Sequence, residues 1–295
     1  MSKGILVFAR NNEEVDYVKQ AYHLAKRTKE YLDLPVTIVT DSKAWLIKYF
    51  PDYTEVFDKI IEIVQTDNDT TASVVRDNST YKSVKRYNDG VYAEKKLQFK
   101  NEMRVLAYQI TPYEQTLVLD TDIIICDNTY LACFNQSNEL LLYKDAYDLS
   151  QQRDYSEFKN VSDTGIDFYW ATCVYFVKSK ANEIFFDLLQ HIHENWSFYN
   201  RTYQLNRRVF RNDHAFSIAI HIMNGHTVGD FANPMPGKLF YTSDKDLLVD
   251  IKYDSLLFLC ENENDRSNYM PIKTKGITVH VMNKFSLNRM LGESE

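Results

Sequence analysis

The stretch Thr116-Leu-Val-Leu-Asp-Thr-Asp-Ile-Ile-Ile-Cys126 decides the fold. Leu117–Leu119 form a short apolar run, which is typical of a strand buried on both faces of a mainly parallel sheet. Asp120 and Asp122 follow at once. Residues two apart in an extended chain point the same way, so these carboxylates can converge at the carboxyl end of the strand. Open α/β sheets bind their ligands at that edge.

Two like charges at the end of a buried strand are costly unless a positive group neutralises them. A divalent cation that carries a phosphate meets this need, and we interpret the pair as a metal–diphosphate site. The simpler alternative is that Asp120 ends a strand and Asp122 lies in a turn, because an Asp-x-Asp triplet alone is a weak signal. The apolar runs Leu117–Leu119 and Ile123–Ile125 favour the site, since turns seldom interrupt so hydrophobic a span.

The segments before this stretch alternate between strand and helix patterns, which predicts a doubly wound beginning. The expected strands are Ile5–Ala9, Val36–Val39 and Lys59–Val64, and the expected helices are Glu13–Tyr31 and Lys43–Tyr49. The polar stretch Asp67–Gly90 is interpreted as a long surface loop. Apolar residues at helical spacing, from Phe99 to Ile110, predict a helix over Ala93–Ile110 that packs on the sheet.

The later chain continues the same alternation. Strands are expected at Leu140–Tyr143, Tyr169–Val177, Ser255–Cys260 and Gly276–Val279, and helices at Ala181–Trp196 and Asn212–Met223. Asp213 is well placed to cap the second helix. Arg201–Arg211 holds four arginines, which form either a solvated face or a surface for an anion. Because neither a repeat nor a linker is evident, we expect a single domain over residues 1–295 with two halves, 1–127 and 128–295.

Composition limits the function classes. With 34 Lys+Arg against 41 Asp+Glu the net charge is −7, so no overall charge recruits nucleic acid or an anionic membrane, and a small-molecule partner is expected. No apolar run approaches the roughly 18 residues of a membrane span. The four cysteines are scattered without a Cys-x-x-Cys pair, which indicates reduced thiols in a cytoplasm. The lack of a Gly-x-Gly-x-x-Gly or Gly-Lys-Ser/Thr motif argues against dinucleotide and P-loop folds.

Taken together, these features resemble the GT-A class of nucleotide-sugar glycosyltransferases, and most closely glycosyltransferase family 8, the family of glycogenin and bacterial galactosyltransferases. The resemblance covers nearly the whole chain. In that family an Asp-x-Asp after the fourth strand binds Mn²⁺, and Leu-Val-Leu-Asp120-Thr-Asp122 is similar to it. A late His after a strand is the third ligand, and His280 in Thr-Val-His-Val matches it. The resemblance therefore implies Mn²⁺ or Mg²⁺ held by Asp120, Asp122 and His280.

The resemblance also implies roles for other residues. Arg104 fits the basic residue that contacts the nucleotide sugar, Lys284 fits the lysine that binds the diphosphate, and Asp213 fits the acid that faces the sugar. The implied donor-binding residues are Ala9, Arg10, Asn11, Asp41, Arg104, Asp120, Thr121, Asp122 and Lys284, and the implied catalytic residues are Asp213 and Arg104. The chain departs from the family in two places. Lys284 follows His280 by four residues without the family's Gly, Pro or Trp, and Trp170-Ala-Thr-Cys173 lacks the family's sugar-contacting Asn.

The implied reaction is metal-dependent transfer of a hexose, from UDP-glucose or UDP-galactose, to an unidentified acceptor with retention of configuration. A dication stabilises the charge that grows on the departing diphosphate, and two carboxylates with an imidazole suit Mn²⁺. Two alternatives stay open. One is a HAD-type phosphotransferase, which uses the first Asp of such a pair as nucleophile but usually places it after the first strand. The other is a nucleotide-sugar-binding protein without transferase activity.

Overall fold

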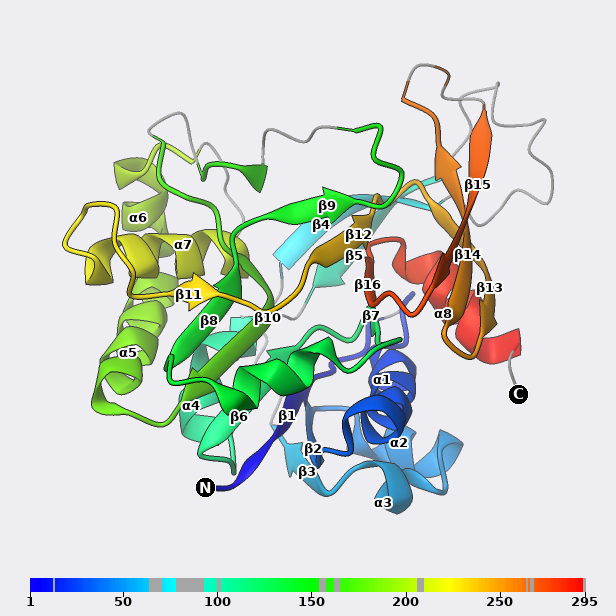
Figure 1. The fold of residues 1–295 in the computed structure, drawn as a ribbon, viewed down its shortest axis with the longest axis horizontal. Coiled ribbons are helices and arrows are strands. Elements are labelled where there is room, and N and C mark those ends of the chain that lie inside the picture. The colour runs from blue at the N-terminus through cyan, green and yellow to red at the C-terminus, as the bar shows by residue number, and fades with distance from the viewer. Residues whose placement is uncertain are drawn as a thin grey trace.

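The computed structural model describes residues 1–12, 14–63, 71–77, 93–99, 102–153, 158–161, 165–205, 210–263, 265 and 268–293, with the backbone alone for 71–77 and 93–99. Figure 1 shows a central sheet with helices on both sides and a smaller group of strands at one end. Within the described part of the chain, every helix is too short or too polar to cross a bilayer.

The central sheet has seven strands in the order β11-β8-β10-β6-β1-β2-β3. They are β1 (Lys3–Phe8), β2 (Val36–Thr40), β3 (Lys59–Glu62), β6 (Gln115–Leu119), β8 (Leu140–Tyr143), β10 (Trp170–Val177) and β11 (Asn233–Pro234). β10 is antiparallel to its neighbours β6 and β8, and the other pairings are parallel. The predicted mixed, mostly parallel sheet flanked by helices is therefore confirmed.

The two strands at the middle of this sheet are apolar on both faces. Ile5–Val7 of β1 pair with Leu117–Leu119 of β6, and all six side chains are buried. A strand of this kind needs cover above and below, which explains the absence of an alternating pattern in the sequence. The burial fixes where β6 ends, and so fixes the position of the acidic residues that follow it.

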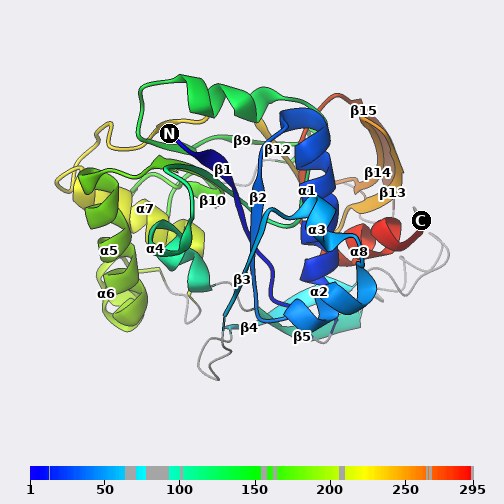
Figure 2. The same ribbon diagram turned by 90° about the horizontal axis from the view of Figure 1, so that it is seen from below.

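Helices cover the sheet in two groups, which Figure 2 separates clearly. The first group is α1 (Tyr17–Leu32), α2 (Lys43–Tyr49), α3 (Tyr53–Val56) and the C-terminal α8 (Lys284–Glu293). The second is α4 (Ala107–Ile110), α5 (Lys180–Glu194), α6 (Trp196–Thr202) and α7 (Asn212–Met223). Two 3₁₀ helices, η3 (Glu102–Leu106) and η4 (Thr129–Asn135), complete the described helical segments. α8 packs against α1, so the first and the last α-helix of the described chain lie on the same side of the sheet.

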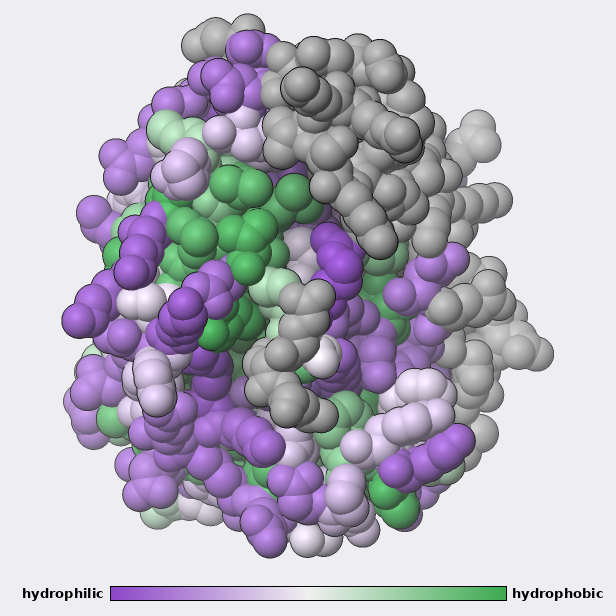
Figure 3. All heavy atoms as spheres, turned by 90° about the vertical axis from the view of Figure 1, so that its right-hand side faces the viewer, coloured by the Kyte–Doolittle hydropathy of each residue, from purple (hydrophilic) through white to green (hydrophobic). Residues whose placement is uncertain are grey.

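Three smaller sheets accompany the central one, of which two pack around the C-terminal part of the chain. The first has the order β7-β16-β12-β9, with β7 (Ile123–Ile124), β16 (Val279–Val281), β12 (Leu239–Thr242) and β9 (Ala146–Asp148). The second is antiparallel, with β13 (Leu247–Lys252), β14 (Ser255–Glu261) and β15 (Tyr269–Lys275). Leu256 and Phe258 of β14 pack with Leu287 and Leu291 of α8 in a second apolar core. Figure 3 views this side of the molecule, where apolar side chains gather in the upper half of an otherwise mostly polar surface.

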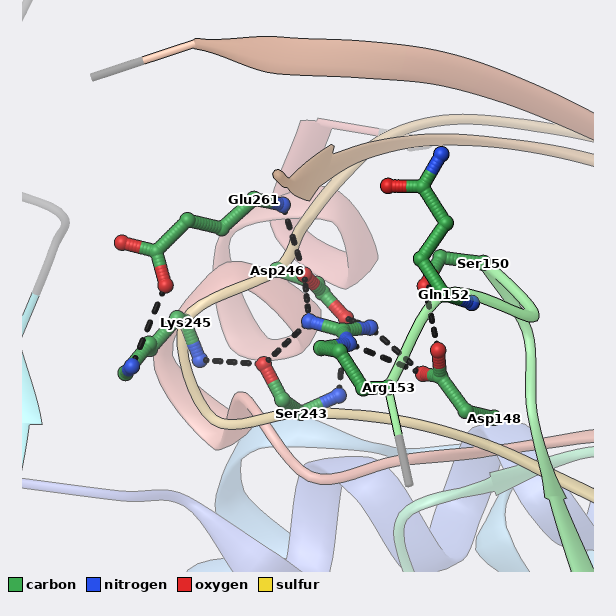
Figure 4. Close-up of polar contacts among 8 residues, drawn as sticks. All are labelled: Asp148, Ser150, Gln152, Arg153, Ser243, Lys245, Asp246 and Glu261. Carbon is green, nitrogen blue, oxygen red and sulfur yellow. Dashed lines mark hydrogen bonds and ion pairs between the residues drawn. The ribbon is translucent and has the colours of Figure 1, made fainter. Parts of the chain in front are cut away.

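A buried ionic network links the four-stranded sheet to the three-stranded sheet (Figure 4). Arg153, after β9, ion-pairs with Asp148 at 2.5 Å and with Asp246 at 2.6 Å. Asp246 also accepts hydrogen bonds from the backbone N–H groups of Ser243 and Glu261. Burial opposes the charge of Arg153, but the two carboxylates raise its pKa above the ordinary value. The segment after β9 is thereby held against the start of β13 and the end of β14.

The predicted helix Ala93–Ile110 is wrong over its first half. Ala93–Phe99 form strand β5, which pairs antiparallel with β4 (Thr71–Asp77) from Thr71↔Phe99 to Asp77↔Ala93. Helical structure begins only at η3 and continues in α4. The loop predicted over Asp67–Gly90 is wrong where β4 lies, and its remaining residues lie outside the described part. Strand pairing across so long an interval leaves no local periodicity, and apolar spacing therefore extended the helix too far.

Most other predicted elements are confirmed with shifted ends. The first helix begins at Tyr17 because Asp16 caps it by accepting a hydrogen bond from the Lys19 N–H at 2.9 Å. The predicted Ala181–Trp196 helix ends at Glu194, and α6 follows at once. The strand predicted at Gly276–Val279 is displaced: Gly276 lies in a turn at φ +61, and β16 begins at Val279. β12, β13 and β15 have no counterpart among the predicted strands.

Candidate metal centre

The acidic pair is held by strands on both sides. Asp120 follows β6, and its backbone N–H donates to Thr172 of β10 at 2.9 Å. The chain then enters β7, where Ile123 pairs with His280 of β16. The Val281 N–H donates to the Asp122 carbonyl at 2.8 Å. This short pairing brings the last strand of the chain against the turn between β6 and β7.

Asp120, Asp122 and His280 converge at this point. Each offers one ligand atom, and the three atoms lie within 4.8 Å of one another. His280 Nε2 is 3.3 Å from Asp122 Oδ1. The Nδ1 atom of His280 is buried and has no hydrogen-bond partner among the described residues. Two carboxylates and an imidazole form a donor set that fits Mn²⁺, and Mg²⁺ to a lesser degree because Mg²⁺ prefers oxygen ligands alone. The structure brings these residues together, and their role as metal ligands stays a prediction.

Lys284 completes the immediate surroundings of Asp122. It is the first residue of α8, and its Nζ lies 2.5 Å from Asp122 Oδ2. Burial disfavours the charge of Asp122, but Lys284 and His280 hold its pKa well below the ordinary value. Burial likewise opposes the charge of Lys284, and Asp122 raises the pKa of that amine. The ion pair therefore stays charged through the neutral pH range.

Arg104 connects Asp120 to Asp213 through the backbone of one residue, Ala171. Arg104, on η3, is buried and ion-pairs with Asp120, and its Nη1 donates to the Ala171 carbonyl at 2.5 Å. The Ala171 N–H in turn donates to Asp213 Oδ1 at 2.9 Å. The chain of contacts runs from η3 across β10 to α7. Arg104, Asp120 and Asp213 were predicted as site residues from the sequence, but no sequence pattern indicates the position of Ala171 between them.

The predicted position of Asp213 as a helix cap is wrong. Arg211 is the N-cap of α7, and Asp213 lies inside the first turn. Its Oδ2 is 3.3 Å from Arg211 Nη2. A carboxylate in the first turn is favoured by the helix dipole, which accounts for its placement without a cap. In the arginine-rich segment Arg201 belongs to α6, whereas Arg207 and Arg208 lie outside the described residues.

Arg10 and Asp41 meet at the carboxyl ends of β1 and β2. The Ala9 N–H donates to the Val39 carbonyl at 2.9 Å, which keeps the two strands paired up to their ends. Arg10 Nε lies 3.2 Å from Asp41 Oδ2, and both side chains are buried. Ser42 Oγ donates to the other oxygen of Asp41 at 2.8 Å. The structure thus brings together three predicted donor-binding residues at the edge where α/β sheets bind ligands.

Two other predicted donor-binding side chains are engaged within the protein. Asn11 donates to Asp16 Oδ1 at 3.0 Å and accepts from the Val18 N–H at 2.9 Å, so it organises the start of α1. Thr121 Oγ1 donates to Gln20 Oε1 at 3.1 Å. Thr121 lies between the two aspartates, and its side chain is directed toward α1. The local fold therefore uses both side chains to hold the elements around the site.

Two aromatic residues near the site were not among the residues predicted from the sequence. Tyr17 is half-buried beside Phe285 with its hydroxyl oxygen buried, and burial raises the pKa of its phenol, with Lys284 opposing the rise. Trp45 on α2 is 41% exposed, donates to Asp16 Oδ2 at 2.8 Å and lies 4.2 Å from the Tyr49 ring. In the sequence, Trp45 could have been noticed because it stands one helical turn after Asp41. Nothing in the sequence connects Tyr17 with a lysine more than 260 residues later.

Comparisons with known proteins give fold likenesses only. No protein-family model matches the chain, and no curated protein matches it. Among solved structures, the chain is similar to a galactosyltransferase, LgtC, in complex with donor and acceptor sugar analogs, at 12% identity and TM-score 0.44, over 94% of this chain and 86% of that one. It is similar to mouse xyloside xylosyltransferase 1 at 12% identity and TM-score 0.40, over 76% and 83%.

The glycosyltransferase GlyE of Streptococcus pneumoniae TIGR4 is similar at 10% identity and TM-score 0.42, over 79% of this chain. The chain spans 45% of the length of GlyE. These neighbours are glycosyltransferases, and membership of family 8 stays a prediction for this chain. Likenesses this distant carry no argument about function, which has to come from the geometry of the site.

Proposed function

We propose that the protein is a metal-dependent glycosyltransferase that uses a nucleotide-sugar donor. One observation carries the proposal: Asp120, Asp122 and His280 present ligand atoms within 4.8 Å of one another, with the buried Arg104 and the half-buried Lys284 in contact with the aspartates. A site with two acids, an imidazole and two fixed positive charges suits a dication that is bound together with a diphosphate. When bound, the ion supplies Lewis-acid stabilisation of the departing diphosphate.

The proposed roles of the cations follow from their contacts. Lys284 neutralises Asp122 in the metal-free protein, and its amine becomes available to a diphosphate oxygen when the carboxylate turns to an ion. Arg104 is buried between Asp120 and the Ala171 carbonyl, so it orients the first acid and adds positive charge. Fixed charges of this kind stabilise a developing anion without the cost of reorganising solvent.

We assign the nucleoside to the edge formed by β1 and β2. The buried Arg10–Asp41 pair, next to Ala9, offers polar groups for a base and a ribose. Asn11 and Thr121 contribute through the elements that they hold in place, since their side chains are already hydrogen-bonded. Residues 1–127 would therefore bind the donor and residues 128–295 would face the acceptor, within one domain.

The finer chemistry is proposed as hexose transfer from UDP-glucose or UDP-galactose with retention of configuration. Asp213 accepts a hydrogen bond from the Ala171 N–H, and the Ala171 carbonyl accepts one from Arg104, which supports a role for Asp213 near the metal centre. We assign it to the neighbourhood of the anomeric carbon, where a carboxylate stabilises positive charge that develops on the sugar ring.

Calorimetric titration of UDP with and without Mn²⁺ tests the proposal. UDP should bind the wild-type protein in the presence of Mn²⁺, and Asp122→Ala should abolish Mn²⁺-dependent binding and turnover while circular dichroism reports a folded protein. Asp145→Ala, which removes an exposed carboxylate, is the matched control and should bind as the wild type does. Unchanged binding in Asp122→Ala would contradict the site.

Two further measurements separate the alternatives. Slow hydrolysis of a UDP-sugar in Mn²⁺ distinguishes an enzyme from a protein that only binds the donor. Release of phosphate from sugar phosphates in the absence of any nucleotide would instead favour a HAD-type phosphotransferase.

A further inference from the structure

A cavity lies behind the turn that carries Asp120 and Asp122. It has a volume of about 320 Å³ and is bounded by α1, by the turn after β6, by the hairpin of β13 and β14, and by α8. Thr121 lines it, whereas Asp120 and Asp122 do not. Figure 2 shows α1 and α8 side by side at this place. Its size is at the lower end of the range for small-molecule sites.

One wall of this cavity is positively charged. Lys26 and Arg27 of α1 line it. Arg27 donates to the carbonyls of Ile125 at 2.8 Å and of Tyr253 at 2.7 Å, contacts that fix the guanidinium without neutralising it. Within the described part of the chain, no carboxylate lies at ion-pair distance from Arg27. Lys26 is 3.6 Å from Asp52, but both groups are nearly half exposed, so that pairing is weak.

His23 adds a polar atom without a partner. Its Nε2 is buried and makes no hydrogen bond to any described residue, and its side chain lines the cavity. Burial and the cations Lys19, Lys26 and Arg27 lower the pKa of His23 to about 4, so the imidazole is neutral near pH 7. A buried polar atom without a partner is costly, and a ligand that hydrogen-bonds to it removes that cost.

The rest of the lining is mostly apolar. Leu24, Ile124, Leu287 and Leu291 line the cavity and are buried, and Ile251 closes it from the β13 side. Together the walls match a molecule with an acidic end and a compact hydrophobic body. We propose that this cavity is a second ligand site for a small organic anion, whose acidic group is bound by Arg27 and Lys26 and whose apolar body contacts the leucines.

The cavity is mechanically linked to the candidate metal centre. Thr121, between the two aspartates, hydrogen-bonds to Gln20 at 3.1 Å, and both residues line the cavity. Gln20 Nε2 also donates to the backbone carbonyl of Lys284 at 3.4 Å. A bound anion therefore touches the helices and the turn that place Asp120, Asp122 and Lys284. By linkage, the anion and the metal–nucleotide pair alter each other's affinity by the same factor, a consequence that rests on the proposed function.

Naphthalene-2-sulfonate is a suitable probe, and 2-naphthol is its neutral analogue. In calorimetric titration of the full chain without metal or nucleotide, the sulfonate should bind more tightly than the naphthol. Lys26→Glu should weaken sulfonate binding about tenfold, through loss of attraction and new repulsion. Ile251→Trp should abolish it by filling the cavity. Lys29→Glu reverses a charge on the same helix outside the cavity, and it should leave binding within about twofold of the wild type.

Equal affinity for sulfonate and naphthol, or binding that survives both Lys26→Glu and Ile251→Trp, would overturn the second site. The linkage has its own readout: saturating sulfonate should change the UDP affinity in Mn²⁺ by about threefold or more. An unchanged UDP affinity would overturn the linkage and leave the anion site standing. Failure of the proposed function would be seen separately, as absence of UDP binding in a protein that still binds the sulfonate.

Discussion

Replacement of Lys284 by Met should move two affinities in opposite directions. The Lys284 amine lies 2.5 Å from Asp122 Oδ2 and competes with any metal ion for that carboxylate. In Lys284→Met, Mn²⁺ alone should therefore bind more tightly than in the wild type. UDP added with Mn²⁺ should bind more weakly, because the diphosphate loses a positive group. If Lys284 served folding alone, the Mn²⁺ and UDP affinities would not change in opposite directions.

The size of both effects follows from Coulomb's law and from charged hydrogen bonds. Two unit charges 4 Å apart interact by about 1 kcal/mol in water and about 4 kcal/mol near a protein surface. Removal of the amine next to a dication should therefore tighten Mn²⁺ binding by at least about tenfold, or 1.4 kcal/mol. A hydrogen bond to a charged group contributes about 1.5–3 kcal/mol, so UDP binding should weaken by about 10- to 150-fold.

The assay is calorimetric titration of Mn²⁺ alone, followed by titration of UDP into Mn²⁺-saturated protein. Lys284→Arg keeps the charge and should recover most of the UDP affinity, while Lys180→Met removes an exposed lysine at the start of α5 and should change neither constant. Thermal melting checks that Lys284→Met is folded. If Mn²⁺ and UDP both bind Lys284→Met as they bind the wild type, the amine does not face the ion or the diphosphate and the reasoning fails.

Three further outcomes follow from the buried charges. Lys284 and His280 depress the pKa of Asp122 from 3.8, so the stability that this carboxylate gives the folded protein is complete above about pH 4 and declines as the pH falls. In urea unfolding, the difference in unfolding free energy between wild type and Asp122→Asn should therefore narrow by about 1 kcal/mol from pH 7 to pH 3. Arg153→Leu leaves Asp148 and Asp246 buried without their cation and should lower the unfolding free energy by about 3–5 kcal/mol in the same assay. Lys252→Leu, at an exposed ion pair, should lower it by less than about 1 kcal/mol. Asp213→Asn should slow UDP-sugar hydrolysis about a hundredfold or more while UDP affinity in Mn²⁺ stays within about threefold, and equal losses in both would remove Asp213 from the reaction.

The acidic turn and its strand could be predicted because their signals are local. Leu117–Leu119 are continuously apolar, and the structure buries them in the middle of the sheet. The two acids follow at once, but Asp122 lies in a turn between β6 and β7 and not in extended chain, so the alternative of a turn is correct for the backbone. Their ligand atoms still converge, together with that of His280. The sheet class followed from the same kind of observation, since runs without alternation indicate strands covered on both faces.

Structural features that depend on residues far apart in the sequence could not be predicted. Ala93–Phe99 became a strand only because Thr71–Asp77 pairs with it. Asp213 looked like a cap because Asp is common there, yet Arg211 occupies that position and the carboxylate instead receives the Ala171 N–H. The network of Arg153 joins residues up to 93 positions apart, and no local pattern announces it.

The spacing between His280 and Lys284 is the sequence's clearest departure from the family 8 motif, and the structure gives it a geometric explanation. β16 ends at Val281, and α8 begins at Lys284. His280 lies in the strand that pairs with β7, while Lys284 stands at the first position of the helix, and both side chains reach Asp122. A tight passage from strand to helix thus lets a separation of four residues bring an imidazole and an amine to one carboxylate. Insertion of three residues between Met282 and Asn283 should therefore lower the melting temperature, because it separates the imidazole and the amine from their shared carboxylate. An unchanged melting temperature would mean that the short connection does not position the lysine.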